Sequence, residues 1–193
     1  MTVVVEGKTD VPVAARLLEF AGLVVGPVHV SRGKDRLDSR LAGYNAAAQR
    51  AEWLVLRDLD HDAECGPELA RRLLPRPSAG MRLRIAVREV EAWLMADHAA
   101  ISAFLGVERR MIPTHTERLD DPKRLLVQIA RRSRNRAIRD DMVPAERTSA
   151  RVGPGYSGRI IDFAQNHWRP RVAARRNPSL AKCIVALRRW ARA

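Results

Sequence analysis

The chain begins with a short β-branched run that ends directly in an acidic motif. Thr2–Val5 reads Thr-Val-Val-Val, and Glu6–Asp10 reads Glu-Gly-Lys-Thr-Asp. A buried strand that ends in Glu-Gly places a carboxylate at the carboxyl edge of a sheet, where open α/β folds bind their ligands. Glycine lets the backbone turn there without a Cβ clash. We therefore expect Glu6 at a functional edge, with Asp10 beside it in the first turn of the following helix.

A second acidic group follows the apolar run Trp53–Leu56, with carboxylates at the alternate positions Asp58, Asp60 and Asp62. Alternate residues of an extended segment point the same way, so Asp58 and Asp60 are expected to converge on one cation. Asp62 joins them only if the chain stays extended. A solvated acidic loop is the alternative. Mutual repulsion of the three carboxylates favours a metal, and hard oxygen ligands indicate Mg²⁺ or Mn²⁺ rather than zinc.

A third acidic group follows Arg82–Val87, in which Leu, Ile and Val alternate with arginine and alanine as in a strand. Glu89 and Glu91 come next. If the strand continues through Glu91, both side chains face the same side of the sheet. If a helix has already begun, they diverge and one of them serves, and we favour Glu91.

Strands and helices alternate through the first half of the chain, which is typical of a parallel sheet with helices on both faces. Strands are expected at 2–5, 23–30, 53–56 and 82–87, with helices at 11–20, 35–52 and 67–74. Further helices are expected at 99–105, 121–132, 157–168 and 177–190, and the polar segment 133–152 is expected to be a mobile loop. The predicted division is a core of residues 1–106 and a basic, mainly helical extension of residues 107–193, with the boundary near 106–113.

The positive charge of the chain is concentrated in its second half. The formal net charge is +13. Residues 1–108 carry 14 Lys and Arg against 15 Asp and Glu, whereas residues 109–193 carry 21 against 7. This asymmetry predicts a polyanionic partner, although a solvated face or a disordered loop is the alternative. The candidate nucleic-acid contacts are Arg131, Arg132, Arg134, Arg136 and Arg139, together with Lys8 and Lys182.

Composition argues against several other classes of protein. The 193 residues contain no apolar run near the roughly 20 residues that span a bilayer, and the first apolar run is too short for a signal peptide. Cys65 and Cys183 lie far apart without the spacing of a zinc site or a disulfide framework. We therefore expect a cytoplasmic protein with no membrane association.

Two of the acidic motifs together resemble the Toprim fold. Glu6 after the first strand, and Asp58-Leu59-Asp60 after a later one, match the Toprim signature of a Glu and an Asp-x-Asp. That fold is shared by topoisomerases of types IA and II, bacterial primases and small ribosomal-RNA maturation nucleases. The Glu-x-x-x-Asp form of Glu6 and Asp10 is most similar to the overcoming-lysogenisation-defect nucleases. Residues 88–94, with the later Gly-Pro-Gly-Tyr and Pro-Ser-Leu, also resemble a group of small standalone prokaryotic Toprim-like proteins.

The resemblance implies a Toprim-like, Rossmann-like, mostly parallel sheet and a metal-dependent nuclease that hydrolyses DNA or RNA. One or two Mg²⁺ or Mn²⁺ ions would act, with Glu6 and Asp10 on one ion and Asp58 and Asp60 on the other. The implied catalytic residues are Glu6, Asp10, Asp58, Asp60 and Glu91, and the implied metal ligands add Asp62 and Glu89. A lysine assists some of these nucleases, and Lys8 and Lys182 are the candidates for that role.

The resemblance also bears on partners. It implies a separately encoded partner ATPase and a role in phage defence. DNA is favoured over RNA as the substrate, and a homodimer is expected of a small basic nuclease. Tyr44 and Tyr156 do not indicate a topoisomerase, because the chain is too short for a strand-passage clamp. The alternative function is a non-catalytic Toprim-like module that binds nucleic acid or another protein.

Overall fold

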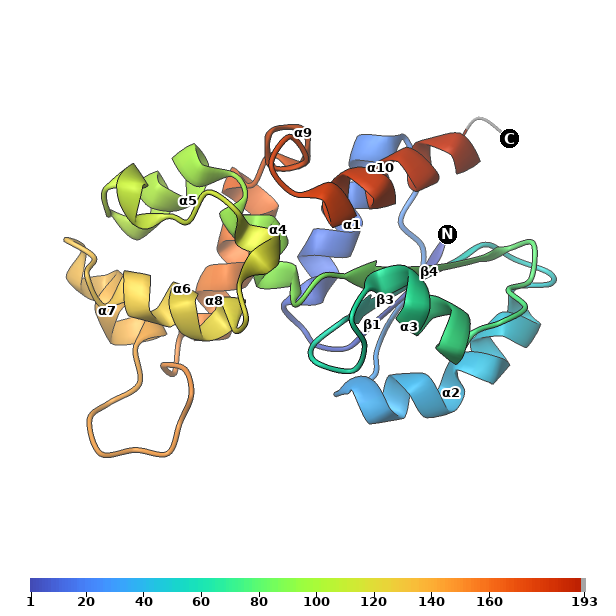
Figure 1. Ribbon diagram of the computed structural model, residues 1–193, viewed down its shortest axis with the longest axis horizontal. Coiled ribbons are helices and arrows are strands. Elements are labelled where there is room, and N and C mark those ends of the chain that lie inside the picture. The colour runs from blue at the N-terminus through green and yellow to red at the C-terminus, as the bar shows by residue number, and fades with distance from the viewer. Residues whose placement is uncertain (192–193) are drawn as a thin grey trace.

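The computed structural model describes residues 1–191 and contains a four-stranded, all-parallel sheet (Figure 1). The strands are β1 (Thr2–Val5), β2 (Val28–Val30), β3 (Trp53–Asp58) and β4 (Met81–Ala86), in the order β2-β1-β3-β4. The register pairs Val4 with Val55 and Asp58 with Ala86. The carboxyl ends of β1, β3 and β4 therefore lie at one edge. The predicted α/β layout, a parallel sheet flanked by helices, is confirmed.

Successive strand residues point to opposite faces of the sheet, so both faces carry apolar side chains and both are covered by helices. Val3 and Val5 pack in the same apolar cluster as buried residues of α1 (Asp10–Ala21). Val4 packs on the other side with residues of α2 (Lys34–Ala47) and α3 (Gly66–Leu73). Strands buried on both faces read as near-continuous apolar runs, as β1 does.

The second half of the chain is helical. Its elements are α4 (Val90–Met95), α5 (His98–Leu105), α6 (Pro122–Ala130), α7 (Arg136–Met142), α8 (Tyr156–Asp162), a π-helical turn (Phe163–His167), α9 (Pro170–Ala173) and α10 (Pro178–Trp190), with 3₁₀ turns at Arg109–Met111 and Thr116–Arg118. Figure 1 shows α4–α8 gathered beyond the carboxyl ends of the strands. The N-termini of α6 and α10 are capped by Asp121 and Asn177, whose side chains accept hydrogen bonds from backbone N–H groups of the first turn.

One apolar cluster crosses the predicted boundary near 106–113. It contains Val5 of β1, Trp93 of α4, Leu126 of α6 and Leu187 of α10. The helical half therefore shares its core with one face of the sheet, and the division into residues 1–106 and 107–193 stays a prediction. In residues 1–191, no helix is long and apolar enough to cross a membrane.

The structure corrects several predicted elements. The segment 133–152 is not one mobile loop, because α7 forms within it: Ile138 and Met142, four residues apart, are buried, and the Asn135 side chain caps the helix. The second strand covers 28–30 rather than 23–30, since Gly26-Pro27 interrupts the run. The long helix ends at Ala47 rather than near 52.

Candidate functional site

Three of the predicted acids gather at the carboxyl edge of β1 and β3. Glu6 Oε1 accepts a hydrogen bond of 2.8 Å from the backbone N–H of Asp58. The Gly7 N–H donates to Asp10 Oδ2 at 2.8 Å, so the turn after β1 folds the Asp10 carboxylate back towards the sheet. Asp10 is buried, and Glu6 and Asp58 are half-buried.

The end of β4 brings two more carboxylates to this edge. Asp58 Oδ1 accepts a hydrogen bond of 3.1 Å from the backbone N–H of Val90, which ties the end of β3 to the first residue of α4. Glu89 and Glu91 flank Val90. We call Glu6, Asp10, Asp58, Glu89 and Glu91 the acidic cluster. It draws its members from the carboxyl ends of three neighbouring strands, as the parallel topology requires.

A lysine from the helical half reaches into the acidic cluster. Lys123 Nζ lies 3.4 Å from Glu89 Oε1 and 3.5 Å from Glu91 Oε1. The Lys123 backbone N–H, in the first turn of α6, also donates to Glu89 Oε2 at 2.9 Å. Burial lowers the pKa of Lys123, but Glu91, Glu89 and Asp58 outweigh it, and the pKa lies above its usual range. Because α4 begins at Val90, the side chains of Glu89 and Glu91 are expected to diverge. The ammonium group of Lys123 nevertheless contacts both of them.

Glu91 is the most deeply buried member of the cluster, with a side chain 1% exposed. The Tyr156 hydroxyl of α8 donates a hydrogen bond of 3.0 Å to Glu91 Oε1. Glu91 Oε2 is also buried, and it has no hydrogen-bond partner among residues 1–191. Buried carboxylate oxygens are normally satisfied, so this oxygen lies where a further donor or a cation is expected.

The acidic cluster carries more negative charge than its protein surroundings compensate. Burial raises the pKa of Glu6 from its usual 4.5 to about 7. Burial raises the pKa of Asp58 well above its usual value, and the nearby Asp10, Glu91 and Glu6 carboxylates add to the effect. The pKa values of Asp10 and Glu89 are also raised, mainly by burial. Such shifts in a group of neighbouring acids are typical of functional sites.

The remaining predicted acids belong to a second, well-compensated group, which we call the Arg57 cluster. Its members are Lys34, Asp38, Arg57, Asp60 and Asp62. Arg57 is 2% exposed, and its Nη2 lies 3.0 Å from Asp38 Oδ2 and 2.6 Å from Asp62 Oδ2. Lys34 Nζ lies 3.1 Å from Asp60 Oδ2 and 2.8 Å from Asp62 Oδ1. Burial acts to raise the pKa of Asp62, but Lys34 and Arg57 hold it below its usual value.

As the side chains stand, Asp58 and Asp60 have different partners, and their convergence on one cation stays a prediction. β3 ends at Asp58, and Asp60 has a left-handed backbone conformation with φ 48°. The alternation of an extended strand is lost at that point, so Asp58 faces Glu91 while Asp60 faces Lys34. Asp62 turns away with Asp60. The two clusters still adjoin, because Arg57 Nε lies 3.6 Å from Glu6 Oε1.

The donors of the acidic cluster fit a hard divalent cation in kind. They are all carboxylate oxygens, which Mg²⁺ and Mn²⁺ prefer, and the unpartnered Glu91 Oε2 leaves one donor free. As the side chains stand, no group of three or more His, Cys, Asp or Glu within residues 1–191 is arranged to hold a metal ion. Lys123 contacts the glutamates instead.

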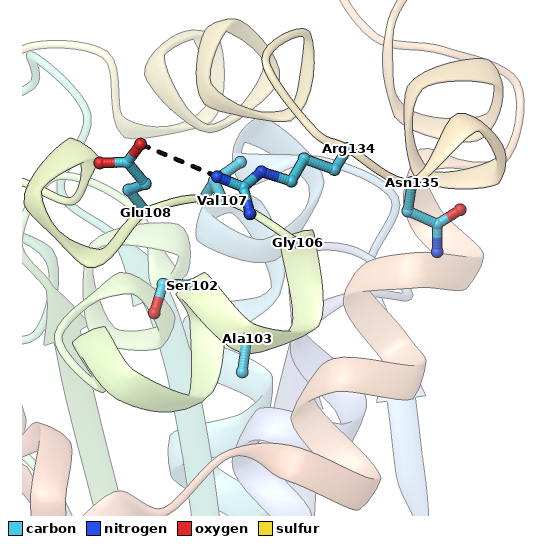
Figure 2. A pocket seen from close by; sticks show the side chains of 7 residues that line it. All are labelled: Ser102, Ala103, Gly106, Val107, Glu108, Arg134 and Asn135. Atoms are coloured by element: carbon cyan, nitrogen blue, oxygen red, sulfur yellow. Dashed lines mark ion pairs between the residues drawn. The ribbon is translucent and has the colours of Figure 1, made fainter.

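The predicted nucleic-acid contacts lie mostly elsewhere. Lys8 is exposed in the turn between Glu6 and Asp10. Arg134 lies at a hollow beside the end of α5, where its Nη2 is 3.9 Å from Glu108 Oε1 (Figure 2). Lys182 of α10 lines a separate groove along β4. Arg131, Arg132 and Arg136 are exposed near the α6–α7 turn, and Arg139 is half-buried on α7.

Three residues of the site were missed from the sequence. Lys123 follows a Pro in a predicted helix start, and nothing local shows that its side chain reaches Glu89, 34 residues earlier in the chain. Tyr156 stands out in the sequence only within Gly-Pro-Gly-Tyr and as a rejected topoisomerase nucleophile, and neither pattern indicates a contact with Glu91. Arg57 directly follows the run Trp53–Leu56, and its position beside three aspartates was the available signal that it compensates them.

No protein-family model, curated protein or solved structure matches this chain.

Proposed function

We propose that this protein is a Toprim-like, metal-dependent nuclease that hydrolyses phosphodiester bonds. The observation that supports this most strongly is the acidic cluster. Carboxylates from three strand ends meet at one edge of a parallel sheet. Within residues 1–191 they are contacted by Lys123, at Glu89 and Glu91, and by Arg57, at Glu6, which leaves the cluster under-compensated. Open α/β sheets bind their ligands at this edge.

Glu6, Asp10, Asp58 and Glu91 are the residues that would hold Mg²⁺ or Mn²⁺, with Glu89 beside them. A bound divalent ion supplies an activated water and stabilises the leaving oxygen of a phosphodiester. Asp60 and Asp62 are not assigned this role, because their carboxylates pair with Lys34 and Arg57.

Other residues of the chain position the acids and balance charge. Lys123 Nζ stays protonated beside Glu89 and Glu91, so it can donate a hydrogen bond to a phosphate oxygen. Tyr156 fixes the orientation of the buried Glu91 carboxylate through its hydroxyl. Arg57, held by Asp38 and Asp62, also forms an ion pair with Glu6 and partly compensates its charge. Lys123 thus replaces Lys8 and Lys182 as the candidate for an assisting lysine.

DNA as the preferred substrate, a partner ATPase, a homodimer, a role in phage defence and a cytoplasmic location stay predictions from the sequence.

The direct test is a cleavage assay on plasmid DNA and total RNA with Mg²⁺ or Mn²⁺. It compares the wild type with Asp58→Asn in the acidic cluster and with Asp62→Asn in the Arg57 cluster. We expect cleavage by the wild type and by Asp62→Asn, and none by Asp58→Asn. Equal cleavage by all three proteins would identify a contaminant. No cleavage by any of them would favour the non-catalytic binding module.

A further inference from the structure

Two adjoining hollows open beside the acidic cluster. The first, of about 260 Å³, is lined by Lys34, Arg88, Glu89 and Arg151 among others. The second, of about 320 Å³, is lined by Asp121, Lys123, Arg124 and Arg151. Asp121 and Arg151 line both hollows, and the Glu89 of the first contacts the Lys123 of the second. The two hollows adjoin at Asp121 and Arg151, and we call them together the cleft, which lies beside the acidic cluster and the start of α6.

Cations from separate elements line this cleft. Arg88 precedes α4, and its Nη1 donates to the backbone carbonyl of Asp60 at 2.6 Å. Arg124 is exposed in the first turn of α6. Arg151 belongs to the long loop between α7 and α8, and the ion pair of its Nη2 with Asp121 Oδ2, at 2.6 Å, ties that loop to the residue that precedes α6. Its side chain is 74% exposed, so much of the guanidinium remains open to a ligand.

The acids of the cleft wall are partly compensated. Asp121 pairs with Arg151, and the exposed Asp120 lies 3.7 Å from His61 Nδ1, which compensates it only when the imidazole is protonated. Asp60 pairs with Lys34. The uncompensated charge is therefore concentrated in the acidic cluster, and cations line the cleft that lies beside it.

We propose that this cleft binds the phosphodiester backbone on one side of the bond that is cut, with Arg124 and Arg151 contacting successive phosphates. The inference rests on the proposed function, because it places the scissile phosphate at the acidic cluster. Phosphates that flank it must then lie in the adjoining space, and the cleft supplies guanidinium groups there. Arg134 of the α6–α7 turn lines a different hollow, beside α5 and Glu108 (Figure 2).

The test measures binding by fluorescence anisotropy, with a labelled DNA duplex and a labelled RNA strand, in EDTA and in Ca²⁺. The cleft variant is Arg124→Gln/Arg151→Gln. The matched control is Arg132→Gln/Arg134→Gln, which removes two exposed positive charges from the α6–α7 turn. Thermal unfolding checks that both variants fold like the wild type. Whichever nucleic acid the wild type binds more tightly shows whether the cleft prefers DNA or RNA.

We expect the cleft variant to bind about tenfold more weakly, and its dependence of log K on log salt to be shallower by about two, because each phosphate contact contributes about 0.9 to that slope. The control is expected to change affinity less than about threefold. The proposal is overturned if the control loses as much affinity as the cleft variant, if the cleft variant binds like the wild type, or if the wild type binds neither nucleic acid.

Mg²⁺-dependent cleavage, measured in parallel, separates this proposal from the nuclease assignment. If the wild type binds through the cleft in Mg²⁺ but cuts neither nucleic acid, the nuclease function fails and the binding cleft stands. If the wild type cuts and the cleft variant binds and cuts equally well, the nuclease function stands and the cleft proposal fails.

Discussion

The acidic cluster and the Arg57 cluster adjoin at the same sheet edge, but they balance their charges differently. In the Arg57 cluster, Asp38, Asp60 and Asp62 share the two cations Arg57 and Lys34, and the pKa of Asp62 is lowered. In the acidic cluster, two glutamates share Lys123, while burial raises the pKa values of Glu6 and Asp58. One cluster is satisfied by the protein alone, and the other is not.

This difference separates a structural use of carboxylates from a functional one. Buried charges destabilise a fold unless partners compensate them, and Arg57 does so for its aspartates. The protein keeps the acidic cluster despite its cost, which is expected where a cation from solution completes the site. Each variant below alters one of the two clusters and is compared with a matched control variant or with the wild type.

The largest effect is expected on cleavage. Asp58→Asn removes a carboxylate from the acidic cluster and should lower the cleavage rate about 10³-fold or more, since a catalytic metal supplies several kcal/mol of charge stabilisation. Asp62→Asn, in the Arg57 cluster, should stay within about tenfold of the wild type, because it loses no cation ligand. Initial rates on plasmid DNA measure both. Equal losses in the two variants would remove the distinction between the clusters.

Arg57→Met should cause the largest loss of stability. It leaves the carboxylates of Glu6, Asp38 and Asp62 without their buried partner, and breaking a buried pair costs about 3–5 kcal/mol. Lys34→Met is the control, because Lys34 is about one-third exposed and its loss should cost less than about 1 kcal/mol. Urea denaturation gives both free energies of unfolding. Similar values for the two variants would contradict the central role of Arg57.

The metal-free protein should lose stability as the pH rises from about 4.5 to about 7. The folded pKa of Glu6 lies above its usual value, so the folded state binds this proton more tightly than the unfolded state does. The favourable contribution is present below the lower pKa and is lost as the pH passes through the higher one. With about 1.4 kcal/mol per pKa unit, the titration of Glu6 alone should lower the free energy of unfolding by about 3 kcal/mol over this pH range.

Urea denaturation in EDTA at several pH values measures this loss of stability. Glu6→Gln keeps a hydrogen-bond acceptor for the Asp58 N–H but cannot ionise, so it should flatten the pH dependence. An unchanged pH dependence in Glu6→Gln would show that Glu6 is not the group responsible.

The smallest effect concerns the orientation of Glu91. Tyr156→Phe removes the hydroxyl that donates to Glu91 Oε1 and should cost about 1 kcal/mol of stability and about tenfold in cleavage rate. Tyr44→Phe is the matched control, since Tyr44 stacks on Trp53 and makes no hydrogen bond to the acidic cluster among the described residues. The same loss in Tyr44→Phe would mean that the Tyr156 hydroxyl has no specific role.

The sheet and the position of Glu6, Asp58 and Glu91 could be predicted because they depend on local patterns. Strand ends in a parallel sheet share an edge, so acids that follow successive strands meet there. The direction of Asp60 could not be predicted, because a left-handed residue reverses the alternation. Lys123 and Tyr156 could not be placed either, since the packing of α6 and α8 on the strand ends is a tertiary property. The helix α7 was not predicted, because the residues around Ile138 and Met142 are mostly polar and resemble those of a loop.

The central claim is that the acidic cluster, and not the Arg57 cluster, binds a divalent cation. Calorimetric titration of Mn²⁺ into the wild type, Asp58→Asn and Asp62→Asn tests it without any substrate. We predict that the wild type and Asp62→Asn bind Mn²⁺ with similar affinity and that Asp58→Asn does not bind it. Absence of binding to the wild type, or unchanged binding to Asp58→Asn, would contradict the claim.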